Sequence, residues 1–228
     1  MATGTFYLRP SGDVEKSDFS VYPSTLEHHY LAINEEECDD SSTYISYDIN
    51  DDGYGYETSV TFDFDGNIPD ALLRILSASI TLCGMGGSSN GTTGYAWVDF
   101  IIYVENDSLT ISGADISESG FEEIFVESET LASLVNKYLK ENNKFPSITV
   151  KLDISGSAGS SKGSERYQIF ISQLFMTFSY STNIGIYKKE RDQYKATTVA
   201  YKKQGGTWTE TSEDECKTII QNNTIRRG

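Results

Sequence analysis

The chain has few basic residues, few cysteines and no long apolar run. Its 228 residues hold 18 Lys and Arg against 34 Asp and Glu, a formal net charge of −16. Nucleic-acid affinity comes mainly from Lys and Arg that neutralise phosphates, so this balance argues against a nucleic-acid partner. No stretch approaches the roughly 20 apolar residues of a membrane helix, and residues 1–13 lack the basic and apolar regions of a signal peptide. We therefore expect no membrane partner.

Cysteine and histidine are too few and too scattered to suggest a metal centre. Cys38, Cys83 and Cys216 are odd in number, far apart and without CxxC spacing. This pattern argues against a disulfide scaffold and a zinc site, and it fits synthesis in a reducing cytosol. His28 and His29 are the only histidines, and no cysteine or patterned carboxylate is spaced to join them on a metal. Adjacent strand positions rarely point at one ion, so we expect both at the surface.

No set of catalytic residues can be assigned from the sequence. Neither histidine belongs to a Ser, His and Asp set with a recognisable nucleophile elbow. With 34 acidic residues, the sequence cannot nominate a glycosidase pair, and a solvated acidic surface explains them more simply. We therefore predict that the chain is not an enzyme and has no cofactor.

Alternating apolar residues predict several half-buried strands. The clearest segments are 54–64, 95–105, 147–155 and 166–180. In the last segment the apolar phase slips by one residue at Ser172-Gln173. This slip predicts a β-bulge in a central strand that is apolar on both faces.

One helix is expected after residue 128. The helical spacing i, i+3, i+4, i+7, i+8 is occupied by apolar residues, namely Leu131, Leu134, Val135, Tyr138 and Leu139. Ser128 or Thr130 can cap its start, and Asn142-Asn143 followed by Pro146 end it. Segment 69–76 fits a helical turn or a strand, and the glycine- and serine-rich stretches 84–94 and 155–164 are predicted as loops. Many strands with one crossing helix predict a mainly β fold, an antiparallel β-sandwich of the jelly-roll kind.

Residues 48–59 resemble part of a calcium-binding loop. Asp48, Asn50 and Asp52 fall on the first three ligand positions of an EF-hand loop. Position 12 should be a bidentate Glu but is Ser59, and no helix pair flanks the loop. We therefore favour an Asp-Gly turn that leads into a strand, with a weak calcium site as the alternative.

Four aromatic residues suggest a second kind of site. If Tyr54, Tyr56, Tyr95 and Trp97 are exposed, they can form a platform on which sugar rings stack. They alternate with core residues, however, so burial in the core is the other interpretation.

The charge and the sequence pattern both change near Gly185. Residues 186–228 hold nine basic and six acidic residues, a net +3, which leaves −19 for residues 1–185. We place the domain boundary here, with a β-sandwich domain at 1–183 and a small basic module and tail at 184–228.

A 14-residue unit is repeated directly after this boundary. Its aromatic positions are Tyr187 and Tyr194 in the first copy and Tyr201 and Trp208 in the second. A Gly-Gly turn in the second copy predicts a β-hairpin, and "ERDQ" takes the place of that turn in the first. Such a unit cannot bury a core alone, so we predict that the four aromatic residues cluster and dock on a partner. The alternative is a tail packed on the sandwich.

The chain resembles a family of tailed-bacteriophage structural proteins. The C-terminal segment is similar to the "YxKxxGxW" repeats that end many such proteins. The N-terminal part follows the order and spacing of one phage family in "FYLRPSGD", "VYPS", "YLAINEEECDDSSTYI", "NNKFP" and "SITVKLDISGSAGSSKGSERYQIFISQLFMTFSY". The resemblance covers roughly residues 5 to 212. No counterpart can be named for "EDECKTIIQNNTIRRG", which begins at Glu213.

The resemblance implies a β-sandwich component of a virion, synthesised in the host bacterial cytoplasm, and it carries no catalytic residues. We expect an accessory head-decoration or fibre-type protein that attaches to other virion proteins through its C-terminal repeats. A homo-oligomer is compatible with this role. The alternative is a carbohydrate-binding module of a tail or baseplate that recognises the host surface. An exposed aromatic row on one face of the sandwich would favour this alternative.

Overall fold

The computed structural model divides the chain into two compact units, Ala2–Thr182 and a second that contains Asn183–Gly228. In the first unit the described residues are 2–15, 17–34, 38, 43–50, 56–69, 72–88, 94–116, 120–158 and 166–182. In the second unit they are the backbones of 186–190, 193–197, 200–204 and 207–211. Within the described part of the chain, no helix has the length and apolar character needed to cross a bilayer.

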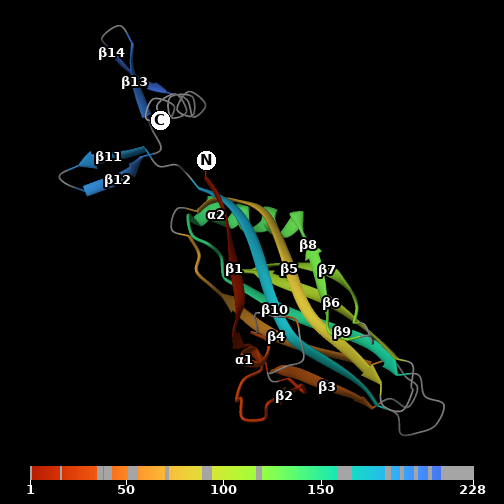
Figure 1. The fold of residues 1–228 in the computed structure, drawn as a ribbon. Coiled ribbons are helices and arrows are strands. Elements are labelled where there is room, and N and C mark those ends of the chain that lie inside the picture. Colours follow the sequence, from red (N-terminus) through yellow and green to blue (C-terminus); the bar gives the residue numbers. More distant parts are fainter. Residues whose placement is uncertain are drawn as a thin grey trace. The chain divides into compact units, whose positions relative to one another are not determined.

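The described residues of the first unit form ten strands and two helices, which Figure 1 labels. The strands are β1 (Ala2–Asp13), β2 (Ser20–Tyr22), β3 (Tyr44–Asn50), β4 (Tyr56–Asp65), β5 (Leu72–Ser88), β6 (Gly94–Val104), β7 (Asp107–Asp115), β8 (Glu122–Glu127), β9 (Ile148–Ala158) and β10 (Arg166–Thr182). The helices are α1 (His29–Ala32) and α2 (Glu129–Asn142). All strand pairs are antiparallel.

The strands form two sheets with the orders β3-β10-β5-β8 and β4-β9-β6-β7. Successive strands from β3 to β10 alternate between the sheets except at the β6–β7 hairpin, which is the connectivity of an eight-stranded jelly roll. Strand β1 links the sheets, because its first half pairs with β10 and its second half with β4. The predicted antiparallel β-sandwich is confirmed.

The core is built from the inward positions of both sheets, as the alternating sequence predicts. Every second residue of β6 is fully buried, namely Ala96, Val98, Phe100, Ile102 and Val104. The neighbouring strand β9 of the same sheet contributes Ile148, Val150, Leu152 and Ile154 in the same way. These alternating segments form strands because each then buries one apolar face and leaves the other to solvent.

Strand β10 is central and contains the predicted bulge. Ile171 pairs with Gly84 and Gln173 pairs with Cys83, so Ser172 is the extra residue. The other edge of β10 pairs with β3 along its first half and with β1 along its second half. The bulge explains why the buried positions change parity, from Tyr167, Ile169 and Ile171 before it to Leu174, Met176 and Phe178 after it.

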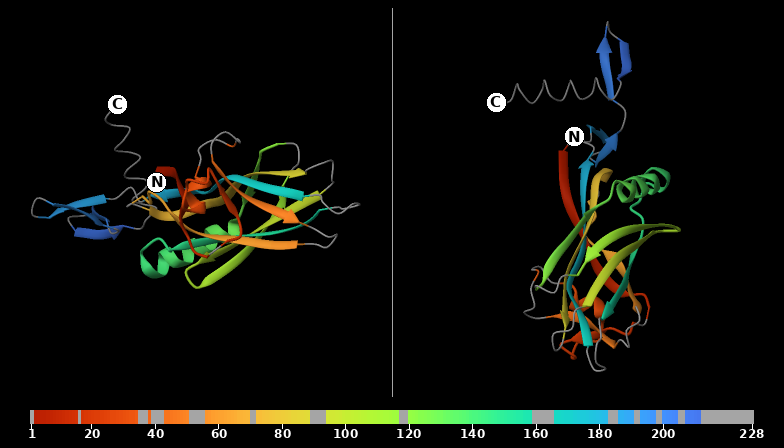
Figure 2. Two further views of the ribbon diagram at one scale, coloured as in Figure 1. Left: turned by 90° about the horizontal axis from the view of Figure 1, so that it is seen from below. Right: turned by 90° about the vertical axis from the view of Figure 1, so that its right-hand side faces the viewer.

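Helix α2 follows β8 and precedes β9 in the sequence. It lies across one end of the sandwich (Figure 1 and Figure 2). Ser128 is its N-cap, since the Ser128 hydroxyl accepts a hydrogen bond from the Leu131 N–H at 3.1 Å. Asn143 ends the helix in a left-handed conformation and donates its N–H to the Leu139 carbonyl at 2.9 Å. Leu131 and Val135 are fully buried, so the predicted helix and its apolar face are confirmed.

An exposed ion pair joins α2 to the β6–β7 hairpin. The Lys137 ammonium donates to the Asp107 carboxylate at 2.6 Å. This hydrogen bond lowers the pKa of Asp107 and raises the pKa of Lys137. Both groups are open to solvent, so water screens the pair and its effect on stability is small.

Three expectations about local structure are corrected or decided. Segment 69–76 leads into a strand, because β5 begins at Leu72. The predicted loops 84–94 and 155–164 begin later than expected, since β5 runs to Ser88 and β9 to Ala158. A Cβ atom at Gly86 would clash with the Tyr167 hydroxyl. Glycine is therefore needed there for close packing within a strand, whereas the sequence suggested a flexible loop.

The chain contains a disulfide, although the spacing of its cysteines argued against a disulfide scaffold. Cys38 and Cys83 form a disulfide, with Cα atoms 5.4 Å apart. Cys83 lies on β5 and is fully buried, and the Ser172 hydroxyl donates to its sulfur at 3.3 Å. Spacing along the sequence does not reveal this pair, because the two residues are 45 positions apart and meet only in the folded chain. Cys216 lies outside the described residues.

The described strands of the second unit form two separate two-stranded sheets, β11 (Ile186–Glu190) with β12 (Gln193–Thr197) and β13 (Ala200–Gln204) with β14 (Thr207–Thr211). Their registers match with an offset of 14 residues, since Ile186 pairs with Thr197 and Ala200 with Thr211. The side chains of Tyr187, Tyr194, Tyr201 and Trp208 lie outside the description. Their clustering and their partner-binding role therefore stay predictions.

Candidate ligand-binding surface

Strand β6 carries a row of aromatic residues on the outer face of the β4-β9-β6-β7 sheet. The outward positions alternate with the buried ones and are Tyr95, Trp97, Asp99, Ile101 and Tyr103. Tyr95 is 58% exposed, Tyr103 is 39% exposed, and Trp97 is partly exposed. Tyr95 and Trp97 thus have the exposure that a sugar-stacking platform requires, whereas Tyr54 and the side chain of Tyr56 lie outside the described residues.

The three rings of this row are exposed or partly exposed and have no ring partner in the described part of the chain. Among the described residues, no other aromatic ring contacts Tyr95, Trp97 or Tyr103. Their apolar faces are therefore available to stack against the C–H face of a sugar ring. We call the outward residues of β6 and the residues paired beside them the β6 surface.

Hydrogen bonds fix the orientation of Trp97. The Trp97 indole N–H donates to Asp99 Oδ1 at 2.9 Å, and the Gly113 N–H donates to the same oxygen at 3.2 Å. A register shift in the β6–β7 pairing brings Gly113 here, and a Cβ atom at that position would clash with the Val98 carbonyl. The ring is therefore held in place before any ligand arrives, which lowers the entropic cost of binding.

Polar residues on the neighbouring strands flank the row. Asp115 on β7 and Ser155 on β9 pair with Trp97 from its two sides. Asp153 on β9 pairs with Asp99, and the Lys151 ammonium lies 3.4 Å from Asp153 Oδ1. Directly paired residues point to the same face of a sheet. Carboxylates accept hydrogen bonds from hydroxyl groups, so aromatic rings and acceptors suited to a sugar lie side by side.

Several aromatic residues on the outer face of the other sheet contact other side chains. Tyr22 stacks on Tyr44 with ring centroids 4.8 Å apart, and Phe170 meets Tyr44 edge-on at 5.4 Å. Burial and, to a lesser extent, the neighbouring Tyr22 raise the pKa of Tyr44. The Arg9 guanidinium lies 5.4 Å from the Phe175 ring centroid. These rings have protein partners and are less suited to stack on a ligand.

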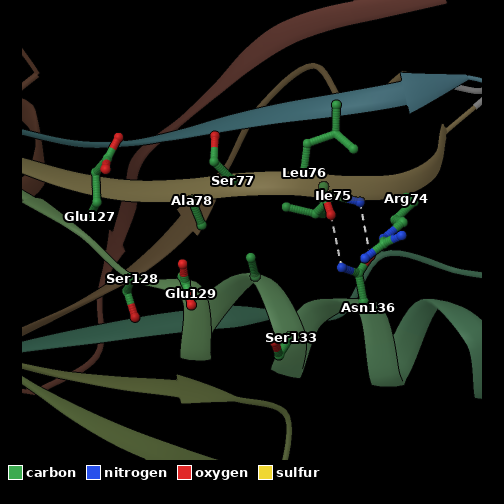
Figure 3. A pocket seen from close by; sticks show the side chains of 11 residues that line it. Arg74, Ile75, Leu76, Ser77, Ala78, Glu127, Ser128, Glu129, Ser133 and Asn136 are labelled. Carbon is green, nitrogen blue, oxygen red and sulfur yellow. Dashed lines mark hydrogen bonds between the residues drawn. The ribbon is translucent and has the colours of Figure 1, made fainter.

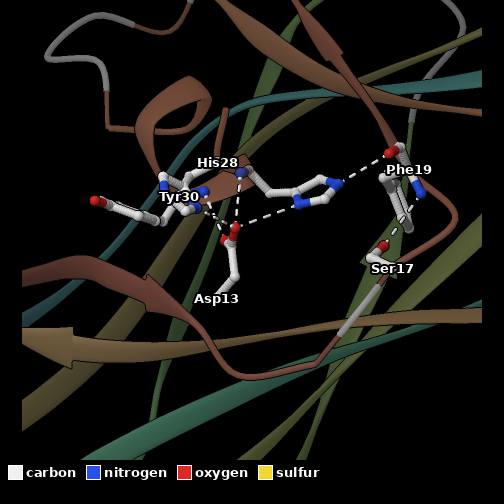
Figure 4. Close-up of polar contacts among 6 residues, drawn as sticks. Asp13, Ser17, Phe19, His28 and Tyr30 are labelled. Carbon is white, nitrogen blue, oxygen red and sulfur yellow. Dashed lines mark hydrogen bonds and ion pairs between the residues drawn. The ribbon is translucent and has the colours of Figure 1, made fainter. Parts of the chain in front are cut away.

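A polar cluster surrounds Asp13 at the end of β1 (Figure 4). The Asp13 carboxylate accepts the backbone N–H groups of His29 at 3.0 Å and Tyr30 at 2.9 Å. The Nδ1 atoms of His29 and His28 lie 3.4 and 3.5 Å from Asp13 Oδ2. His29 Nε2 lies 2.9 Å from the Phe19 carbonyl oxygen, so neither ring nitrogen of His29 is positioned to activate a nucleophile.

The expectation that both histidines lie at the surface is half right. The His28 side chain is 53% exposed, but that of His29 is only 17% exposed. Its carboxylate partner is 16 residues earlier in the sequence, so local patterning could not reveal this contact. The cluster caps α1 and holds it against β1, which is a structural role.

A surface cavity of about 300 Å³ lies between the start of β5 and the first turns of α2 (Figure 3). Its polar lining includes Arg74, Glu127, Glu129 and Asn136. The Asn136 amide is already paired with the backbone of Ile75, donating to its carbonyl and accepting its N–H at 2.8 Å each. The lining holds no aromatic ring, so this cavity lacks the stacking group that the β6 surface has.

The calcium alternative is not tested by the described residues. The Gln168 amide donates to Asp48, while the side chain of Asn50 and all of Asp52 lie outside the description. Within the described part of the chain, no group of three His, Cys, Asp or Glu residues is arranged to hold a metal ion.

Comparisons with known proteins yield no family. No protein-family model matches the chain, and no curated protein matches its sequence. One similar solved structure is that of TmCBM61 in complex with beta-1,4-galactotriose. The TM-score is 0.38 and the identity 8%, over 74% of this chain and 86% of that one. At this level of similarity we transfer neither ligand nor site from that protein.

Sequence patterning identified only part of the candidate site. Tyr95 and Trp97 were recognised, but Tyr103 was not, although it shares their parity. Asp99 was also missed, although it lies on β6 with the parity of the row. Asp153 was missed because its position beside the row depends on the pairing of β6 with β9.

Proposed function

We propose that the first unit is a non-enzymatic carbohydrate-binding domain that holds its ligand on the β6 surface. The observation that carries this proposal is the row of exposed rings at Tyr95, Trp97 and Tyr103, which have no ring partner among the described residues. An aromatic face and adjacent carboxylates together match the apolar and hydroxyl sides of a sugar. A binding role needs no catalytic group, and His29 is committed to Asp13 and Phe19.

We further propose that the chain is a component of a bacteriophage particle, attached through its second unit. The resemblance of the sequence to phage structural proteins supports this role, and so do the two hairpins of equal register. In this proposal the second unit docks on other virion proteins and the first unit displays its glycan-binding face to the host surface. Host-surface carbohydrate would then be the natural ligand.

Trp97→Ala is expected to weaken glycan binding about tenfold or more, which corresponds to about 1.4 kcal/mol of lost stacking. The full chain is screened on an array of neutral and charged oligosaccharides, and the affinity of each hit is measured by calorimetry. The matched control is Phe125→Ala, because Phe125 is 58% exposed but lies on β8 of the other sheet. The affinity of the Phe125→Ala variant for the same oligosaccharides should equal that of the unmodified chain.

Two results of this experiment would overturn the proposal. If the chain binds no oligosaccharide on the array, the domain is not a carbohydrate-binding domain. If Phe125→Ala loses binding while Trp97→Ala retains it, the ligand lies on the other sheet.

A chain that ends at Asn183 is expected to unfold with nearly the same free energy as residues 1–183 do within the full chain. The reason is that the described hydrophobic core lies wholly within Ala2–Thr182. The same truncation should fail to join phage particles, and Trp208→Ala in the full chain should weaken attachment. Denaturant titration and particle co-sedimentation measure the two effects. Normal incorporation of residues 1–183 would show that the repeats are not the attachment element.

A further inference from the structure

We propose that the β6 surface binds an extended, ribbon-like β-1,4-linked chain of uncharged or amine-bearing sugars and that Asp153 makes it reject anionic glycans. This inference rests on the proposed carbohydrate-binding function. It specifies the length, the shape and the charge of the ligand.

The length of the ligand follows from the spacing of the rings. Tyr95 and Tyr103 are eight residues apart on one continuous strand, a span of about 26 Å at roughly 3.3 Å per residue. This span exceeds the size of a single sugar, so one monosaccharide cannot contact both ends of the row. Affinity should therefore increase with the number of sugar units until the chain reaches Tyr103.

The shape of the ligand follows from the continuity of the row. The aromatic positions lie on one face of β6, which pairs with β9 without interruption from Gly94 to Val104. A β-1,4-linked glucan is a flat ribbon, and it can lie along such a row. A coiled α-1,4-linked chain would leave the row after a few units.

The charge of the ligand follows from the groups beside the row. The outward carboxylates on the four strands are those of Glu57, Asp63, Asp65, Asp99, Asp115 and Asp153. The outward cation among the described positions of these strands is Lys151, which lies 3.4 Å from Asp153. A carboxylate on the sugar would meet charges of its own sign, and such a juxtaposition opposes binding.

Asp153 is the residue that discriminates most directly between ligands of different charge. It is directly opposite Asp99, and like charges in this arrangement repel. Asp99 is committed to the indole of Trp97 and to the Gly113 N–H. The Asp153 side chain is 46% exposed, and Lys151 at 3.4 Å offsets only part of the negative charge of the two carboxylates. An incoming ammonium group would relieve the repulsion, and an incoming carboxylate would add to it.

Three pentasaccharides with one backbone test the inference on the full chain by calorimetry. The probes are cellopentaose, the β-1,4-linked glucosamine pentamer, and a β-1,4-linked glucuronate pentamer. We expect the first two to bind and the glucuronate pentamer to bind at least tenfold more weakly. Glucose and cellotriose should bind more weakly than cellopentaose. Because charge makes the selection, the difference should shrink as salt is raised.

Asp153→Asn isolates the residue responsible. It should leave the affinity for cellopentaose within about threefold and bring that for the glucuronate pentamer closer to it, a change of less than about 0.7 kcal/mol for the neutral probe. Glu127→Gln on β8 is the matched control and should change neither affinity.

The outcomes separate the inference from the proposed function. Equal binding of the glucuronate pentamer, or selection that survives Asp153→Asn, would overturn the charge assignment. Trp97-dependent binding of α-linked or anionic chains on the array, with no binding of cellopentaose, would overturn the inference and leave the proposed function standing. If no glycan binds, the proposed function fails and the inference fails with it.

Discussion

Phe100→Ala is expected to lower the free energy of unfolding by about 3–5 kcal/mol. Phe100 is fully buried at the centre of β6, where it pairs with Leu152 on β9 and Ile111 on β7. Removal of its ring leaves a cavity among residues on three strands that cannot collapse together, so both the transfer energy and the packing are lost. A domain of ordinary stability, about 5–15 kcal/mol, would lose a large part of its margin. Chemical denaturation followed by circular dichroism measures the change.

Tyr103→Ala is the control on the same strand. Tyr103 has the opposite parity and is 39% exposed, so its substitution should cost much less than that of Phe100. An equal loss of stability in the two variants would mean that the inner and outer faces of β6 have been assigned the wrong way round.

Removal of the Cys38–Cys83 disulfide is expected to cost about 4 kcal/mol, because it closes a loop of 45 residues in the unfolded chain. The double variant Cys38→Ala/Cys83→Ala should lose this stability. Cys216→Ala should not, because Cys216 is not part of the pair. Equilibrium denaturation without reductant measures all three proteins.

Thiol titration gives an independent check of the same bond. Denatured, unreduced wild-type protein should show one free thiol per chain, since two of its three cysteines are paired. Three free thiols would show that the bond does not form.

The strands and the helix were predicted best where an element buries one face and exposes the other. Segments such as 95–105 bury every second residue, so alternation alone identified the strand and its inner face. The helix at 129–142 was predicted for the same reason, with its start narrowed to Ser128 or Thr130 by the chemistry of capping. The bulge at Ser172 was visible as a change of apolar phase.

Contacts between distant parts of the chain could not be predicted in this way. The disulfide, the contact of His29 with Asp13 and the glycine at position 86 each depend on a partner far away in the sequence. Glycine in particular is ambiguous, because the same residue serves a flexible loop and a close approach inside a strand.

The candidate site was predicted in its aromatic part and missed in its polar part. Tyr95 and Trp97 were recognisable as aromatic residues in an alternating strand. Whether they are exposed depends on which of the two alternating sets of β6 residues faces the core. Ala96 and Val98 are fully buried, so Tyr95 and Trp97 face outward. Asp153 comes beside the row only through the pairing of β9 with β6.

The most direct test of the glycan-binding claim uses the fluorescence of Trp97. The chain contains two tryptophans, Trp97 and Trp208, so Trp208→Phe leaves Trp97 as the single indole. A panel of neutral pentasaccharides is titrated into this variant, and binding is followed by calorimetry and by tryptophan emission. The account predicts a saturable change in emission with the same dissociation constant as the heat signal. Binding heat without any change in Trp97 emission would contradict it.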